Sequence, residues 1–359
     1  MDPFYAQLTS FENLYHAYLA ARRGKRDRAE VAAFTVSLED ELFTLQEELR
    51  AFRYIPGAYR SFVVHEPKRR LISAAPFRDR VVHHALVQVI EPLFERRFIF
   101  DSYANRKGKG THAALDRFTH FARRPLKGIC DLRYVLPCDV RQFFPSVDHA
   151  ILRGQLAHVI CDEATLWLCD RILDSGAGVL SGEYSMVYFP GDDLFAAGRP
   201  RGLPIGNLTS QFWANVYLDA LDQFVKHRLR CRGYVRYVDD FALFSDNRRE
   251  LADWRKAIIE QSAMLRLTLH EERAHVRPVT EGVTFLGLRV FPDHRRLSSR
   301  RGHYARRRLQ ALATQVANGD IPLLRLSASA RSWATHAAHG DTYGLRRAVL
   351  SFVIRLYRK

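Results

Sequence analysis

The sequence lacks any apolar run approaching the roughly 20 residues of a membrane-spanning helix, and basic residues outnumber acidic ones. Among 359 residues, Lys plus Arg number 55 and Asp plus Glu 39, which gives a net charge of +16. This excess favours a polyanionic partner, and nucleic acid is expected rather than a membrane surface. Early acidic residues and the missing cleavage site argue against a signal peptide. We therefore expect a cytoplasmic protein with no membrane partner.

Cysteine is scarce, and no two cysteines form a C-x-x-C pair. Structural zinc sites and disulfide frameworks need paired or regularly spaced cysteines. The fifteen histidines, including His83 and His84, show no zinc-type spacing either. We therefore expect reduced thiols, mostly in the core, and no zinc site. The five cysteines are Cys130, Cys138, Cys161, Cys169 and Cys231.

Apolar residues make up 47% of the chain, enough for a sizeable core shared by two or three substructures. Their spacing predicts helices and strands. Expected helices are 37–53 (Ser37 and Asp40 resembling a capping box), 78–94, one from near Thr111, one within 202–225, 248–265 and the basic tail beyond 293. Expected strands are two within 60–72, then 134–140, a hairpin around 236–244, 268–276 and 283–291. Residues 174–200 are expected to form an irregular insertion.

Two adjacent carboxylates, Asp239 and Asp240, lie inside the apolar stretch RYVDDFALF (236–244). Asp is common in hairpin turns, but such turns usually place Gly beside it, whereas Val238 precedes this pair. Neighbouring carboxylates repel each other, and a divalent cation with hard oxygen ligands, such as Mg²⁺, would remove that cost. Asp139, at the end of the expected strand 134–140, could supply a third carboxylate. Asp148 fits a helix cap better.

Five segments occur in the order of motifs A to E of reverse transcriptases, and the sequence resembles that family over about residues 55–300. The segments are Asp139 with Phe143 and Phe144, GLPIGNLTSQ (202–211), YVDDF (237–241), LTLHEER (267–273) and FLG (285–287). The resemblance implies an RNA-directed DNA polymerase with an α+β, right-hand polymerase fold. It implies fingers at 1–130 with an N-terminal helical extension, and a palm of antiparallel sheet plus helices at 131–290. A fingers-like insertion is expected at about 150–203, and a basic helical thumb at 291–359.

The same resemblance implies two Mg²⁺ ions, for which Mn²⁺ could substitute. Asp139 and Asp239 would bind both ions, Asp240 would be the third carboxylate, and the backbone carbonyl of Val140 would join them. The substrates would be deoxynucleoside triphosphates, with template RNA and an RNA/DNA hybrid as nucleic-acid partners. Arginine runs at 300–308 are expected to hold phosphates from the thumb.

The residues expected around the nucleotide are also carried over from the family. Arg69 matches its triphosphate-binding arginine, and Phe144 its steric gate against the 2′-hydroxyl. Arg273 stands where lysine is usual, and a guanidinium is a poor proton donor. Ile205 stands where many members have glutamine. Isoleucine lacks the hydrogen-bonding amide of glutamine, and its presence here predicts low fidelity. The full expected set is Lys68, Arg69, Gln142, Phe143, Phe144, Ile205, Gly206 and Arg273, with Phe143 also readable as a core aromatic.

The run around LPIGN resembles the bacterial and phage enzymes of diversity-generating retroelements. That resemblance implies adenine-directed mutagenesis and a small basic helical-bundle accessory protein. A retron or phage-defence reverse transcriptase is an alternative within the same chemistry. An inactive RNA-binding scaffold is an alternative of another class, and the intact aspartates argue against it. A two-metal nuclease fits the ordered motifs poorly.

Overall fold

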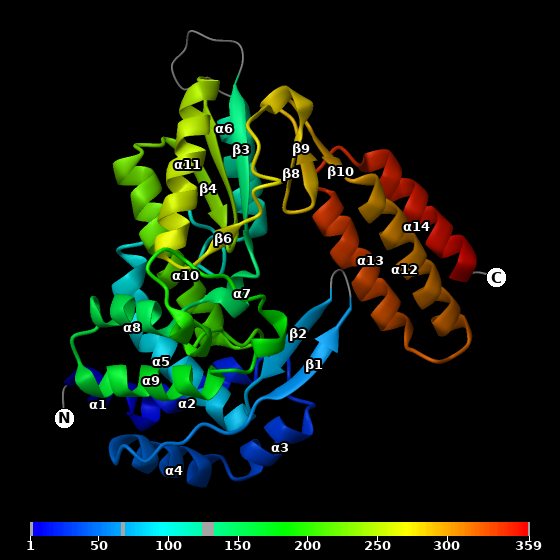
Figure 1. Ribbon diagram of the computed structural model, residues 1–359. Helices are drawn as coiled ribbons and strands as arrows, with labels where there is room; N and C mark the ends of the chain where they lie inside the picture. The colour runs from blue at the N-terminus through cyan, green and yellow to red at the C-terminus, as the bar shows by residue number, and fades with distance from the viewer. Residues whose placement is uncertain (1–2, 66–68, 124–132, 358–359) are drawn as a thin grey trace.

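The computed structural model describes residues 3–65, 69–123 and 133–357, and it combines helices with three antiparallel sheets (Figure 1). The predicted α+β class is confirmed. The first helices, which lie together at the bottom of Figure 1, are α1 (Pro3–Leu8), α2 (Phe11–Ala21), α3 (Ala29–Val36), α4 (Leu38–Arg50) and α5 (Phe77–Glu95). In α4, Leu42, Leu45 and Leu49 are buried on one stripe. The expected capping box is wrong, because Ser37 makes no side-chain capping bond.

A two-stranded sheet follows α4 in the chain, as the sequence predicts. Strand β1 (Arg60–Val64) pairs with β2 (Arg70–Ala74) in antiparallel register. Every residue of β1 is exposed, whereas β2 is largely covered. The sheet therefore projects from the body with β1 as its outer edge.

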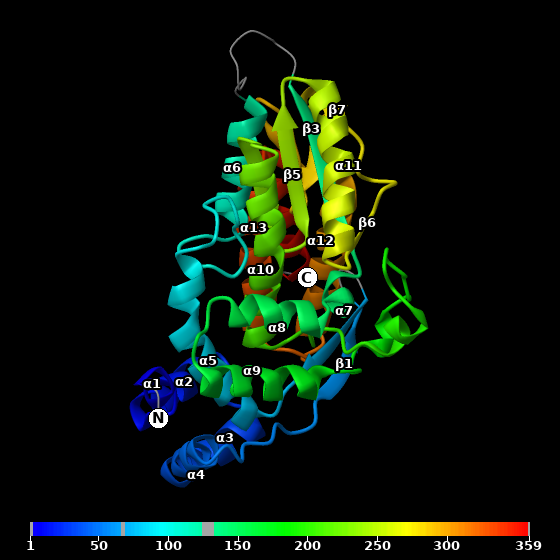
Figure 2. The ribbon, with the colours of Figure 1, turned by 60° about the vertical axis from the view of Figure 1, so that its left-hand side comes forward.

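The central sheet has the strand order β4 (Gly233–Tyr237), β5 (Asp240–Ser245), β3 (Tyr134–Arg141) and β6 (Thr268–Leu269), and β7 (Arg277–Pro278) also pairs with β3. Helices cover both of its faces (Figure 2). Phe241 and Leu243 pack into the core formed with α10 (Leu208–Gln223) and α11 (Arg248–Met264). Ala242 and Phe244 pack instead against α6 (Thr111–Arg123). Because side chains alternate between two buried faces, β5 is almost continuously apolar.

Two predicted strands are shorter than expected. Residues 268–276 form strand structure only at β6, because the N–H groups of Arg273 and Ala274 turn back to the His270 carbonyl. Residues 283–291 form a hairpin, with β8 (Val283–Phe285) pairing with β9 (Leu288–Val290) and β9 with β10 (Arg295–Leu297). The two turn residues Leu286 (φ 47°) and Gly287 (φ 92°) both have positive φ, as a tight hairpin turn requires.

The C-terminal part is a three-helix bundle of α12 (Ser299–Ala317), α13 (Leu323–Ala337) and α14 (Tyr343–Tyr357). Its small core contains Leu309, Ala313, Leu326, Val349 and Val353. Helix α12 ends before Asn318 and Gly319, and Gly319 has the left-handed φ of 79° that is typical of the residue after a helix. Just before the bundle, Arg295 of β10 hydrogen-bonds Thr119 at 2.7 Å and pairs with Asp116 at 2.7 Å. These contacts fix the start of the bundle to α6.

Most of the remaining elements lie between β3 and α10 in the chain. They are α7 (Phe143–Ser146), α8 (His149–Ala157), α9 (Glu163–Gly176), η1 (Ser181–Glu183) and η2 (Leu194–Gly198). The π-helical turn η3 (Phe224–Arg228) follows α10, and the short turn η4 (Val279–Glu281) follows β7. Residues 174–200 are largely irregular, as expected. Asp148 is the predicted helix cap, since its Oδ1 accepts the Ile151 N–H.

The four cysteines in the described ranges are all free thiols, as expected. Cys138, Cys169 and Cys231 are buried and Cys161 is exposed, whereas Cys130 lies outside those ranges. No helix in them combines the length and the apolar character needed to cross a membrane.

Candidate active site

The three predicted catalytic aspartates lie at one end of the central sheet, on β3, on β5 and in the turn between β4 and β5. Asp139, near the end of β3, is the register partner of Asp240, the first residue of β5. Asp239 lies in the turn between β4 and β5, and its carbonyl accepts the Val140 N–H at 3.4 Å. Antiparallel pairing therefore brings residues 100 positions apart to one end of the sheet. The sequence predicted that Asp139 would lie beside the hairpin, and the pairing of β3 with β5 agrees; the catalytic role of the three aspartates stays a prediction.

The chemistry of this carboxylate set suits a hard divalent cation. In the present arrangement, no group of three or more His, Cys, Asp or Glu side chains within the described ranges is gathered closely enough to hold a metal. Arg273 Nη1 lies 3.4 Å from Asp139 Oδ2, and the two side chains are 64% and 25% exposed. Solvent therefore weakens this ion pair, which leaves the Asp139 carboxylate available to a competing cation.

Cys138, the residue before Asp139, is buried on the face of β3 that packs into the core with α10 and α11. Burial raises the pKa of its thiol far above the ordinary value, with Arg255 opposing and Asp139 adding to the shift. The thiol therefore stays protonated at neutral pH. It contributes packing and no thiolate ligand.

Three residues after β3 were assigned to the nucleotide site, and the structure gives each a different environment. Phe143 is 2% exposed and packs on Tyr217, so it belongs to the core. Phe144 is half-buried, and its carbonyl accepts the Leu203 N–H at 2.8 Å. Gln142 adopts a left-handed φ of 47°, donates to the Glu183 carbonyl at 2.9 Å and accepts the Ser185 N–H. Gln142 thus ties the 174–200 insertion to the end of β3.

The LPIGN turn is fixed to strand β2. The Ser73 N–H donates to the Ile205 carbonyl at 2.8 Å. Asn207 donates to the Ser73 carbonyl at 2.9 Å and accepts the Ala75 N–H at 3.0 Å. Gly206 has a φ of 123°, and a Cβ there would lie 3.0 Å from Ile72. Glycine is therefore favoured here by its positive φ and by the tight space beside the Ile72 side chain. The role of Asn207 was missed, because a single asparagine after glycine carries no sequence pattern for a distant strand.

Arg69, the predicted triphosphate-binding residue, is paired with an acidic residue of the insertion. Its Nη1 lies 2.8 and 2.9 Å from the two carboxylate oxygens of Glu183. The Arg69 side chain is more than half exposed, so this pair is weak and can exchange partners. Lys68, the other predicted phosphate contact, lies outside the described residues.

Residues 65–290 match the family described as reverse transcriptase (RNA-dependent DNA polymerase). The chain belongs to this reverse transcriptase family. The predicted enzyme class, an RNA-directed DNA polymerase, is confirmed through this membership. The site described above lies within the matched residues.

The reverse transcriptase sequence is also similar to several known proteins. Protein YkfC of Escherichia coli K12 is 24% identical over 304 residues, which are 73% of this chain and 74% of YkfC. Group II intron-encoded protein LtrA of Lactococcus lactis is 24% identical over 219 residues, 60% of this chain and 33% of LtrA. The solved structure of an apo telomerase from Candida tropicalis aligns with 67% of this chain, and the alignment covers 55% of the telomerase chain. The sequence identity is 12% and the TM-score is 0.49. The chain thus spans about three quarters of YkfC and a third of LtrA.

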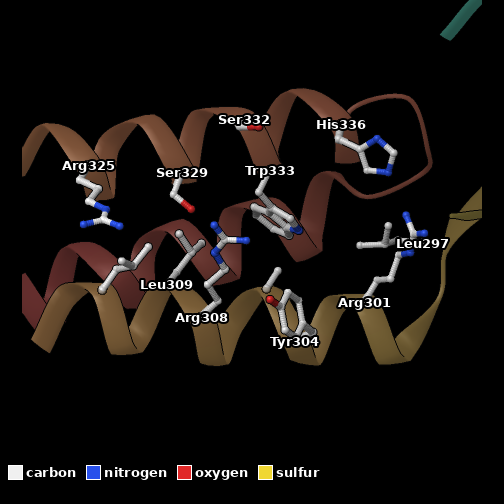
Figure 3. Close-up of a pocket in the computed structure, with 12 residues that line it drawn as sticks. Leu297, Arg301, Tyr304, Arg308, Leu309, Arg325, Ser329, Ser332, Trp333 and His336 are labelled. Carbon is white, nitrogen blue, oxygen red and sulfur yellow. The ribbon is translucent and has the colours of Figure 1, made fainter. Parts of the chain in front are cut away.

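A basic groove crosses the C-terminal bundle of this reverse transcriptase (Figure 3). It lies between α12 and α13, has a volume of about 560 Å³, and combines three exposed arginines with two aromatic residues. They are Arg301, Arg308, Arg325, Tyr304 and Trp333. Guanidinium groups bind phosphate oxygens bidentately, and aromatic rings stack on bases or sugars. The groove is therefore a candidate nucleic-acid interface.

Proposed function

We propose that this reverse transcriptase copies a template RNA into complementary DNA, with Asp139, Asp239 and Asp240 at the reaction centre. The observation that carries the proposal is the register pairing of Asp139 with Asp240 beside the Asp239 turn. The test is extension of a labelled DNA primer on an RNA template with deoxynucleotides and Mg²⁺, with chelator added to a parallel reaction. Extension that stops with chelator supports the proposal, and binding of the duplex without extension favours an inactive scaffold.

The aspartates, with the Val140 carbonyl, are the residues that would hold two Mg²⁺ ions. When bound, such a pair would stabilise negative charge on the attacking and leaving oxygens in nucleotidyl transfer. The remaining roles belong to the chain itself. Arg69 would bind the triphosphate after leaving Glu183, and Arg273 would bind phosphate after leaving Asp139. Phe144 would lie under the sugar and exclude a 2′-hydroxyl, and the α12–α14 bundle would hold the RNA/DNA hybrid as a thumb.

We further propose that the enzyme serves a diversity-generating retroelement in a bacterium or phage, acting in the cytoplasm with a small basic helical-bundle accessory protein. The sequence run around Ile205 supports this, whereas the similarity to LtrA, a group II intron-encoded protein, favours an intron-type element. Sequencing complementary DNA from the cognate RNA, with and without the candidate partner, separates these possibilities. Errors concentrated at template adenines support the retroelement. An even error distribution favours an intron-type, retron or phage-defence enzyme.

Replacing Ile205 with glutamine is expected to lower misincorporation by about 3- to 10-fold, the value of one hydrogen bond. The backbone of Ile205 is fixed by Ser73, so the new amide would enter a defined turn beside the proposed nucleotide site. Ile205→Leu is the matched control, because it keeps an apolar side chain without an amide. An error spectrum that is the same in both variants and the wild type would disprove the role in fidelity.

Removing charge from the thumb groove is expected to weaken hybrid binding in a salt-dependent way. Each lost phosphate contact lowers the slope of log K against log salt by about 0.7 to 0.9. For Arg301→Gln, Arg308→Gln and Arg325→Gln combined, the magnitude of the slope should fall by about 2 to 3. The control is a triple glutamine variant at the exposed Arg53, Arg153 and Arg171, which lie outside the groove. Equal slopes for the two triple variants would rule out the groove as the interface.

A further inference from the structure

Arg236, on β4, is a fully buried arginine whose five N–H donors all have acceptors. Nε and Nη2 bind the two oxygens of Asp222 at 2.8 and 2.6 Å, and Nη2 also donates to Ser102 Oγ at 3.0 Å. Nη1 donates to Asn215 Oδ1 at 3.2 Å and to the Val238 carbonyl at 3.1 Å. One side chain thus links α10, the segment at residue 102 and the β4–β5 turn.

The last of these contacts lies immediately before the aspartates. Val238 has a φ of 54°, a conformation that β-branched residues rarely adopt. Backbone in such a region persists where the surrounding structure determines it. The guanidinium bond to the Val238 carbonyl is one such determinant, and Asp239 is the next residue in the chain.

The atoms that hold Arg236 are themselves fixed from outside the turn. Asn215 also donates to the Ala104 carbonyl at 2.8 Å, and Asp222 also accepts the Tyr234 hydroxyl at 2.7 Å. The backbone of Arg236 pairs with the 101–103 segment, accepting the Tyr103 N–H and donating to the Asp101 carbonyl. The arginine is therefore held by Asp222, Asn215 and the 101–103 segment, and Nη1 also donates to the turn at the Val238 carbonyl.

We propose that Arg236 is a positioning residue that fixes the β4–β5 turn so that Asp239 faces the carboxylate of Asp139. The role in catalysis rests on the proposed function, but the role in the turn does not. A buried ion pair alone is weak support for stability, since apolar replacements of such pairs are often neutral or stabilising. The bond from Nη1 to the turn is what distinguishes positioning from packing.

The test compares Arg236→Lys with Ser102→Ala. Lysine keeps a cation opposite Asp222 but has a single nitrogen, so it cannot bind Asp222 and the Val238 carbonyl in the arginine's fork geometry. Ser102→Ala removes one acceptor of the same guanidinium and leaves the bond to the turn. For Arg236→Lys, we expect kcat to fall about 10- to 100-fold, as small misplacements do. The KM for primer–template should stay within about twofold and the Mg²⁺ requirement should rise.

A second measurement does not depend on activity. Amide hydrogen exchange in residues 237–241 should accelerate in Arg236→Lys and remain near wild type in Ser102→Ala. If lysine is poorly tolerated, adding Val238→Gly should restore part of both readouts, because glycine adopts positive φ without cost. Equal losses in the two single variants, following the fall in melting temperature, would overturn the proposal. If the wild type itself extends no primer, the proposed function fails and hydrogen exchange still decides the role of Arg236.

Discussion

Asp139→Ala and Asp239→Ala are each expected to abolish primer extension, with losses of at least about 10³-fold. Metal-bound carboxylates provide several kcal/mol of transition-state stabilisation, and each ~1.4 kcal/mol corresponds to about a tenfold change in rate. Asp139 lies on β3 and Asp239 lies in the β4–β5 turn beside the register pair of Asp139 and Asp240, so each should be indispensable by itself. Extension is measured on an RNA template with a labelled primer, and duplex binding in parallel.

Binding should survive both substitutions, because the proposed contacts to the duplex lie in the α12–α13 groove and not at the aspartates. A matched control is Asp170→Asn, which removes the carboxylate of a solvent-exposed ion pair between Asp170 on α9 and Arg153 on α8. That control should extend primers at the wild-type rate. Robust extension by the Asp139→Ala/Asp239→Ala double variant would refute the assignment of the reaction centre.

The central part of this site could be predicted from the sequence because short stretches around the aspartates are enough to indicate its strands. The apolar run in RYVDDFALF and the apolar strand ending at Asp139 each indicate a buried strand with carboxylates at its end. The ordered motifs then predict that the strands are neighbours, and the register of Asp139 with Asp240 agrees. The backbone conformation of YVDDF could not be predicted in the same way. Nothing in the sequence indicates that Val238 has positive φ.

The parts that were missed depend on contacts between residues distant in the chain. Arg69 meets Glu183 across 114 positions, and Asn207 reaches Ser73 across 134. Such pairs involve single polar residues, which have no periodicity. The FLG segment was expected within one strand because the usual Asn-Gly turn dipeptide is replaced by Leu286 and Gly287. Local pattern thus gives the strands, and tertiary packing decides where polar side chains bind and where the chain turns.

Phe144→Ala is expected to raise ribonucleotide incorporation relative to deoxynucleotide incorporation by about 10- to 200-fold, the range for one steric contact in a pocket. The half-buried ring of Phe144 packs 5.3 Å from the ring of Phe143, which supports it from the core. Its backbone is fixed by Leu203, so the ring cannot easily withdraw. The measurement is kcat/KM for each sugar on the same primer–template.

Two matched variants separate gating from packing. Phe144→Tyr keeps the ring and should retain sugar selectivity. Phe143→Ala removes a ring that is 2% exposed and should cost about 3–5 kcal/mol of folding free energy. Its selectivity per folded molecule should change much less than that of Phe144→Ala. The two neighbouring phenylalanines, identical in type, therefore divide into a core residue and a substrate-facing residue by burial alone. Unchanged sugar selectivity in Phe144→Ala would remove that distinction and leave both rings with a packing role.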